Sequence, residues 1–313
     1  MTSIIFMGTP AFSAPILRML VEEGYNVKAV VTQPDRPVGR KKVLTAPPVK
    51  EEAIELGLPV IQPNKLKGSE ELEQIIALKP DLIITAAFGQ ILPKELLDVP
   101  ELGCINVHAS LLPAYRGGAP IHQAIIDGQS KTGVTIMYME EKLDAGDIIS
   151  QSEISIEHTD DTGQLFEKLS AVGSNLLKET LPSIIAKENN RTKQDDSLVT
   201  FAKNISREQE RMDWNNSALQ LHNQIRGLHP WPVAYTTLEG QVVKIWKADT
   251  INTQTNEKPG TVVKIESDYF VVQTGKSDAI RINELQPAGK KKMSAEDYLR
   301  GVGSKLRIGD TFE

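Results

Sequence analysis

The sequence predicts an α/β protein with an open, mostly parallel Rossmann-like sheet, followed by a small C-terminal β-barrel of the oligonucleotide-binding (OB) type. Short apolar, β-branched runs alternate with helical periodicity over roughly the first 180 residues, which is typical of a parallel sheet. A polar, aperiodic stretch begins near Glu188, and five short strand patterns follow it. We therefore expect a first domain at residues 1–189, a linker at 190–205 and an OB-like domain at 206–313.

In the first domain, strand-like runs are each followed by a helical pattern. Strands are expected at residues 3–8, 27–32, 81–85, 103–108 and 134–139, and helices at 12–23, 49–56, 70–78 and 121–126. Leu165, Leu169, Val172 and Leu176 form a further helical stripe before Pro182. Because strands and helices alternate, the helices are expected to cover both faces of a parallel sheet.

The second domain begins with a short helix, at roughly 217–226, and continues with strands. These are expected at residues 233–238, 242–248, 260–265, 269–273 and 279–282. Turn formers, among them Gly240, Pro259 and Gly275, lie between them. Five short strands in about a hundred residues favour a small closed barrel, although composition does not separate the OB type from other small barrels.

Composition excludes several classes of protein. The chain of 313 residues has one cysteine, Cys104, so it cannot form an intrachain disulfide, and one cysteine with five histidines argues against a structural zinc site. The first residues do not resemble a signal peptide, and no apolar run reaches the ~20 residues of a membrane helix. We expect a cytoplasmic protein that does not enter the membrane.

Two common nucleotide-binding motifs are missing. The first strand ends at Gly8-Thr9-Pro10, where a dinucleotide-binding fold carries three glycines, and only one of the three is present. A phosphate-binding loop of the G-x-x-x-x-G-K-[ST] type is absent from the sequence as well. Dinucleotide binding and nucleotide triphosphate hydrolysis are therefore not supported.

Two polar side chains share one face of a predicted strand end. Side chains alternate along a strand, so Asn106 and His108 lie on the same face, with Val107 on the other. Ligands of open α/β sheets bind at the carboxyl ends of the strands. An amide and an imidazole there are suited to hold an oxygen that gains negative charge. The alternative is a structural histidine at a capped strand end.

A Gly- and Pro-rich loop and an acidic loop follow. Gly117 and Gly118 of the first loop permit close approach of the backbone, and Pro113 and Pro120 stiffen it. Asp144, in the loop after strand 134–139, is a candidate orienter or base for His108 if the two strand ends are neighbours. It fits a surface acid in a turn equally well, because spacing alone does not decide.

The residues around this site carry a family resemblance. Asn106-x-His108, Ser110-Leu111-Leu112-Pro113, the stretch Tyr115–Pro120 and Leu143-Asp144-x-Gly146-Asp147 together resemble the 10-formyltetrahydrofolate-dependent formyltransferases. The opening residues 5–10, the loop Gln33–Arg40 and three tail segments, 229–232, 243–248 and 285–291, are similar to the members that formylate methionine on initiator tRNA.

The resemblance implies roles for particular residues. Asn106, His108 and Asp144 are the implied catalytic residues, acting with 10-formyltetrahydrofolate as co-substrate and without a metal. Ser110, Leu111, Leu112 and Pro113 are implied to line the folate site. The implied tRNA contacts are Arg36, Arg40, Lys41 and Lys42, in a stretch from Pro34 to Lys50 that holds five basic residues and one acidic residue; an isolated charge run of this kind is otherwise an ordinary solvated loop. The barrel is implied to contact the tRNA further along.

The expected function is transfer of the formyl group from 10-formyltetrahydrofolate to the α-amino group of methionyl-initiator tRNA, by a monomer. One alternative is another folate-dependent formyltransferase, or a formyltetrahydrofolate hydrolase. A second alternative is a non-catalytic RNA-binding protein that kept the barrel.

Overall fold

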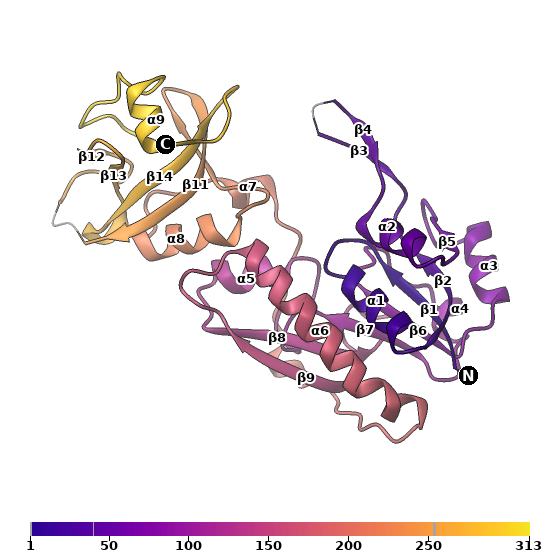
Figure 1. Ribbon diagram of the computed structural model, residues 1–313. Coiled ribbons are helices and arrows are strands. Elements are labelled where there is room, and N and C mark those ends of the chain that lie inside the picture. The colour runs from indigo at the N-terminus through magenta and orange to yellow at the C-terminus, as the bar shows by residue number, and fades with distance from the viewer. Residues whose placement is uncertain (1, 40, 253–254) are drawn as a thin grey trace. The chain divides into compact units, whose positions relative to one another are not determined.

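The computed structural model describes residues 2–39, 41–252 and 255–313 (Figure 1). Its contacts divide the chain into two compact units, each built from several stretches. Unit 1 comprises the described residues up to Pro120, Lys131–Ser155 and Phe166–Lys203; unit 2 comprises Ile121–Ser130, Ile156–Leu165 and the described residues of Asn204–Glu313.

Unit 1 is an α/β unit. Its strands are β1 (Ser3–Gly8), β2 (Asn26–Val31), β3 (Arg36–Val38), β4 (Val43–Thr45), β5 (Val60–Ile61), β6 (Leu82–Ala86), β7 (Cys104–His108), β8 (Lys131–Tyr138) and β9 (Ile148–Ser155). Its helices are α1 (Ala14–Glu22), α2 (Pro48–Glu55), α3 (Glu70–Ala77), α4 (Lys94–Leu97), the part of α6 (Thr162–Ile185) from Phe166 on, and a 3-10 turn at Asp196–Leu198.

Seven strands of unit 1 form one sheet in the order β5-β2-β1-β6-β7-β8-β9. The five strands from β5 to β7 are parallel, whereas β8 is antiparallel to β7 and β9 is antiparallel to β8. This confirms the open, mostly parallel sheet. The sequence did not indicate β9, because half-buried and exposed residues alternate along it instead of forming an apolar run.

Helices cover both faces of this sheet, as expected. Ile5 and Met7 of β1 pack in one apolar cluster with Leu72 and Ile75 of α3. On the opposite face, Gly173 of α6 lies so close to the sheet that a Cβ there would be 3.0 Å from Val107 Cγ1. Thr85, Asn106 and His108 are on the α3 face, because they alternate with Ile84, Ile105 and Val107 along their strands.

The helical stripe from Leu165 to Leu176 lies in α6, which continues through Pro182 to Ile185. A proline inside a helix removes one helical N–H. The next turn still forms, since Ala186 N donates to Pro182 O at 3.0 Å.

Unit 2 is mainly antiparallel. Its strands are β10 (Tyr235–Leu238), β11 (Gln241–Ile251), β12 (Val262–Ile265), β13 (Phe270–Gln273), β14 (Ala279–Pro287) and β15 (Met293–Ser294). Its helices are α5 (Pro120–Ile126, from Ile121 on), α7 (Arg207–Glu210), α8 (Ala218–Gly227) and α9 (Ala295–Arg300), with a 3-10 turn at Gly275–Ser277.

The five main strands pair in the order β10-β11-β14-β13-β12. The last residues of the chain join the two edges of this sheet. Glu313 exchanges backbone hydrogen bonds with Thr237 of β10, and Phe312 N donates to Gly260 O just before β12. An apolar core that includes Phe270 and Leu285 fills the interior, which agrees with the small barrel expected from the sequence.

In the described part of the chain, no helix combines the length and the apolar character needed to cross a bilayer.

Candidate active site

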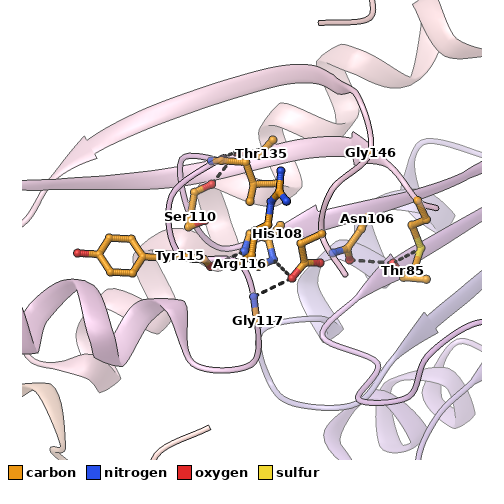
Figure 2. Close-up of polar contacts among 12 residues, drawn as sticks. Thr85, Asn106, His108, Ser110, Tyr115, Arg116, Gly117, Thr135 and Gly146 are labelled. Carbon is orange, nitrogen blue, oxygen red and sulfur yellow. Dashed lines mark hydrogen bonds and ion pairs between the residues drawn. The ribbon is translucent and has the colours of Figure 1, made fainter. Parts of the chain in front are cut away.

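Strand β7 places Asn106 and His108 on one face of the sheet, two residues apart (Figure 2). β7 lies between β6 and β8, so both side chains project from the interior of the sheet and not from an edge. Asn106 is half-buried and His108 is buried. Polar side chains in such a setting need partners, and each of them has a specific one.

Thr85, on the neighbouring strand β6, orients the Asn106 amide. The Thr85 hydroxyl donates to Asn106 Oδ1 at 2.7 Å (Figure 2). With its oxygen engaged, the amide presents Nδ2 on the other side, and no described residue accepts a hydrogen bond from that nitrogen. Asn106 Nδ2 is therefore a free, oriented donor next to His108.

His108 is held by one ring nitrogen and faces a carboxylate with the other. Its Nε2 lies 3.0 Å from the carbonyl oxygen of Tyr115, which only accepts, so Nε2 carries the hydrogen. Its Nδ1 lies 3.8 Å from Asp144 Oδ2, a close ion-pair distance but too long for a hydrogen bond. Nδ1 is thus the nitrogen that can exchange a proton with a group placed beside Asp144.

Asp144 reaches His108 by an unexpected route. Because β8 is antiparallel to β7, Tyr138 pairs with Ile105, near the amino end of β7. The loop after β8 folds back and brings the Asp144 carboxylate to His108, where it accepts a hydrogen bond from Gly117 N at 2.8 Å. The structure thus brings together the amide, imidazole and carboxylate side chains that the sequence singled out.

Gly117, in the loop after β7, is a position that demands glycine. Its φ is +121°, and a Cβ there would lie 2.5 Å from the carbonyl oxygen of Ala202. Any other residue would clash with this backbone oxygen, and the same displacement would pull Gly117 N away from Asp144. The glycine therefore serves the site directly.

Ser110, Leu111, Leu112 and Pro113 form the turn after β7. The Ser110 hydroxyl donates to Ala114 O at 2.7 Å, and Leu112 is buried. Leu111 and Pro113 are half-buried, so they are the members of this turn with surface left for a ligand.

A pocket of about 460 Å³ is lined by residues of α4 and of the segment that follows β8. Leu97, Met139, Glu140 and Lys142 are among its lining residues. Met139 connects it to the site, because its sulfur lies 3.2 Å from the Thr85 hydroxyl that orients Asn106. The volume is within the range of small-molecule sites.

Cys104 lies on the same face of β7, two residues before Asn106. It is buried, and burial raises the pKa of its thiol to about 12. A thiol in this state is a poor nucleophile, so covalent cysteine chemistry has no support at this site.

Three of the four candidate tRNA contacts lie on a two-stranded hairpin, β3–β4. Arg36, Lys41 and Lys42 are exposed, while Arg40 lies outside the described residues. Figure 1 shows the hairpin projecting from the rest of unit 1. At its base, Asp35 binds Lys50 and Gln62, and these partners hold the pKa of the Asp35 carboxyl below its usual value, with Gln62 the larger influence.

Sequence reasoning missed three positions that shape the site. These are Thr85, the carbonyl of Tyr115, and Gln194, whose amide contacts the loop of Asp144. A threonine in an apolar strand and a glutamine in a polar stretch carry no local signal of such roles. Only their hydrogen bonds to residues far away in the chain reveal them.

Comparison with known proteins identifies the family. Residues 1–181 match the formyl transferase family model, and residues 204–303 match that of the formyl transferase C-terminal domain. The chain is 70% identical, over the full length of both chains, to the methionyl-tRNA formyltransferase of Lysinibacillus sphaericus (strain C3-41). It is 62% identical to that of Bacillus subtilis (strain 168), with 96% of this chain and 95% of the relative covered.

A solved structure supports the fold. The N-formyltransferase from Helicobacter canadensis, in complex with folinic acid and dTDP-3-aminofucose, matches with a TM-score of 0.68 at 19% identity, covering 92% of this chain and 100% of that one. The full-length sequence matches and the arrangement of Asn106, His108 and Asp144 lead to one conclusion: the chain is a formyltransferase and belongs to the methionyl-tRNA formyltransferase family.

Proposed function

We propose that this enzyme transfers the formyl group of 10-formyltetrahydrofolate to the α-amino group of methionine carried by initiator tRNA. The observation that carries the proposal is the meeting of the Asn106 amide, His108 Nδ1 and the Asp144 carboxylate. Similarity to the methionyl-tRNA formyltransferases over the whole chain supports the choice of acceptor.

Asn106 and His108 donate hydrogen bonds to the oxygen of the formyl group. Negative charge develops on this oxygen when an amine attacks the formyl carbon. Asn106 Nδ2 donates a hydrogen bond to it, and removal of one such donor typically lowers the rate by about 10²–10³. His108, fixed through its Nε2, offers Nδ1 as the second donor when the ring carries a second proton beside Asp144.

The amine forms a bond to the formyl carbon, the bond from that carbon to N10 of the folate breaks, and N10 takes up a proton as the amine loses one. Asp144 serves the proton that leaves the amine. Its carboxylate is 12% exposed and lies 3.8 Å from His108 Nδ1, which leaves space for the transferred proton to pass between them or through a water molecule. The Gly117 N–H fixes the carboxylate oxygen that faces His108.

The folate supplies the formyl group, and the residues present fit it. The pocket lined by α4 and the segment after β8 meets the site through Met139; Leu97 and Met139 give it apolar surface for a ring, and its other lining side chains are charged and can bind hydrogen-bonding edges. Leu111 and Pro113 would contact the folate from the turn after β7, together with the backbone of Ser110 and Leu112.

The β3–β4 hairpin serves the tRNA. Its tip carries Lys41 and Lys42. Val38 and Leu44 on its stem are 56% and 67% exposed. Basic side chains neutralise phosphates, and exposed apolar side chains contact bases and sugars. A small amine substrate would need neither. The barrel of unit 2 would contact the tRNA elsewhere.

The test is a reconstituted formylation assay. The purified protein is incubated with 10-formyltetrahydrofolate and methionyl-initiator tRNA, and formyl-methionine is measured after hydrolysis of the ester. Parallel reactions contain methionyl-elongator tRNA, a dTDP-amino sugar or no acceptor. We expect formyl-methionine from the initiator tRNA and at least tenfold less product in the other reactions.

Asn106→Ala is the matched variant. We expect its kcat to fall by about 10²–10³ with little change in the KM for tRNA. Formylation of the amino sugar in place of the tRNA, or folate hydrolysis without an acceptor, would contradict the proposal. So would undiminished turnover in Asn106→Ala.

A further inference from the structure

Arg116 is a buried arginine whose guanidinium makes its short hydrogen bonds to a neutral amide and not to a carboxylate. It is 2% exposed and ranks first by volume among the fully buried side chains of the described chain. Its nearest carboxylate oxygen, Asp196 Oδ1, is 4.0 Å from Nη2, and the Asp196 side chain is 73% exposed. Burial of a guanidinium is costly unless its N–H groups are engaged. Here two of them converge on a neutral partner, Gln194.

Gln194 is itself buried, and its amide is fully occupied. Its Oε1 accepts from Arg116 Nε at 3.1 Å and from Arg116 Nη2 at 2.7 Å. Its Nε2 donates to the carbonyl oxygens of Asp144 and Gly146, at 2.9 and 2.8 Å. A guanidinium only donates and a carbonyl only accepts, so the amide has a single possible orientation. Because Arg116 binds Gln194 Oε1, the Gln194 Nε2 amide must face the Asp144 loop, where it donates to the two carbonyl oxygens.

The Asp144 backbone needs such support. Its φ is +47°, in the left-handed region that residues other than glycine rarely occupy. The residue is held from both sides: Gln194 binds its carbonyl oxygen, and Gly117 N binds its carboxylate. Both contacts depend on adjacent residues. Arg116 orients Gln194, and the next residue, Gly117, donates to the carboxylate.

The preceding residue, Tyr115, holds His108 through its carbonyl oxygen. Three consecutive residues therefore control both members of the His108–Asp144 pair. The backbone of this tripeptide is anchored to the segment after Gln194, because Arg116 N donates to Thr200 O and Ala202 N donates to Arg116 O.

We propose that Arg116 and Gln194 are positioning residues, which hold the Asp144 backbone so that its carboxylate stands at the working distance from His108 Nδ1. This inference rests on the proposed function for the role of Asp144 in proton transfer. The positioning itself is a structural statement and can be tested without the reaction.

Gln194→Glu is the variant that isolates the effect. The glutamate keeps the size of the side chain and its acceptor for Arg116, but it places a carboxylate oxygen against the carbonyls of Asp144 and Gly146. Gln273→Glu is the matched control. Gln273 is 1% exposed, and its Nε2 donates to the two backbone carbonyls of Thr274 and Asp278, in unit 2. Both variants exchange a buried bridging amide for a carboxylate, and only one of them touches the Asp144 loop.

The first measurement is amide hydrogen exchange of Gly117, whose N–H donates to Asp144. We expect at least tenfold faster exchange in Gln194→Glu and no change in Gln273→Glu. This result does not depend on catalysis. Unchanged exchange of the Gly117 amide in folded Gln194→Glu overturns the positioning role, whether or not the proposed function holds.

The second measurement is a double-mutant cycle with Asp144→Asn, read as kcat in the formylation assay. We expect Gln194→Glu to lower kcat at least tenfold in the wild-type background and less than twofold in the Asp144→Asn background, with the KM values for both substrates unchanged. Equal losses in both backgrounds, or a loss confined to KM, overturn the inference. If wild-type protein forms no product, the proposed function fails, and the exchange measurement alone decides the positioning role.

If Gln194→Glu does not fold, the double variant Arg116→Met with Gln194→Met replaces it. Exchange of both partners of a buried polar pair for apolar side chains is often nearly neutral for stability. The same faster exchange of the Gly117 amide and the same loss of kcat are expected. A double variant that retains native exchange and native kcat overturns the proposal.

Discussion

Substitution of Gly117 by alanine should damage both stability and catalysis, by amounts that the structure lets us work out. The added Cβ would be 2.5 Å from Ala202 O, and real Cβ atoms stay at least 3.0 Å from such an atom, so the backbone must move by at least 0.5 Å, the difference. The positive φ adds strain of about 1–2 kcal/mol. Weakening of the hydrogen bond from Gly117 N to the Asp144 carboxylate adds about 1.5–3 kcal/mol.

The expected destabilisation of Gly117→Ala is therefore about 2.5–5 kcal/mol, which lowers Tm by on the order of 10 °C for a unit of this size. Because the Asp144 carboxylate loses its hydrogen bond from Gly117 N, and only the bond from Gln194 to the Asp144 backbone remains, kcat should fall by about 10–100-fold. Thermal unfolding followed by circular dichroism and the formylation assay measure the two effects.

Gly68→Ala is the control that separates strain from the clash. Gly68 also has a positive φ, +73°, but a Cβ there would meet nothing within 4 Å. It should cost about 1–2 kcal/mol and leave kcat unchanged. If Gly117→Ala has the same Tm as Gly68→Ala and a kcat within twofold of wild type, the assigned role of Gly117 is wrong.

Three further predictions concern the amide, the hairpin and the thiol. Thr85→Val removes the donor to Asn106 Oδ1 and should lower kcat about fivefold, the worth of one net hydrogen bond, whereas Thr85→Ser should retain the wild-type kcat. Alanine at both Lys41 and Lys42 should raise the KM for tRNA and reduce the slope of log KM against log salt by about 1.4–1.8, the contribution of two phosphate contacts. The native thiol of Cys104 should resist alkylation at pH 8, because its pKa is raised to about 12 by burial, and should react only after unfolding.

Each of these predictions has an outcome that would contradict it. Equal kcat values for the valine and serine variants at position 85 would remove Thr85 from the orientation of Asn106. Alanine at Lys65 and Lys67, two exposed lysines outside the hairpin, should not change the salt slope; if it has the same effect as the hairpin variant, the contact is not localised there. Rapid labelling of folded protein by iodoacetamide would show that Cys104 is accessible.

Much of the sheet and part of the site could be predicted from the sequence. Burial on both faces makes the parallel strands continuous apolar runs, so β1, β6 and β7 stand out. The alternation of side chains along a strand then puts Asn106 and His108 on one face. These are local properties, and local spacing is sufficient to read them.

The remaining features depend on contacts between distant residues. Arg116 and Gln194 are 78 positions apart, and nothing in the polar stretch around Gln194 distinguishes a buried amide from a solvated one. The approach of Asp144 to His108 depends on the antiparallel direction of β8. The apolar pattern of this strand does not reveal its direction, because parallel and antiparallel neighbours bury the same side chains.

The interleaved composition of the two units determines how this enzyme can be cut into parts. A fragment of residues 204–313 would lack two stretches that belong to the same compact unit, Ile121–Ser130 and Ile156–Leu165. Ile126, which packs on the barrel core, and Thr162, which donates to Gly227 O at 2.7 Å, would be missing from it. A truncation at the apparent boundary would therefore leave the barrel core without part of its cover, with bare apolar surface and a tendency to aggregate. Studies of unit 2 in isolation require these two stretches to be grafted back.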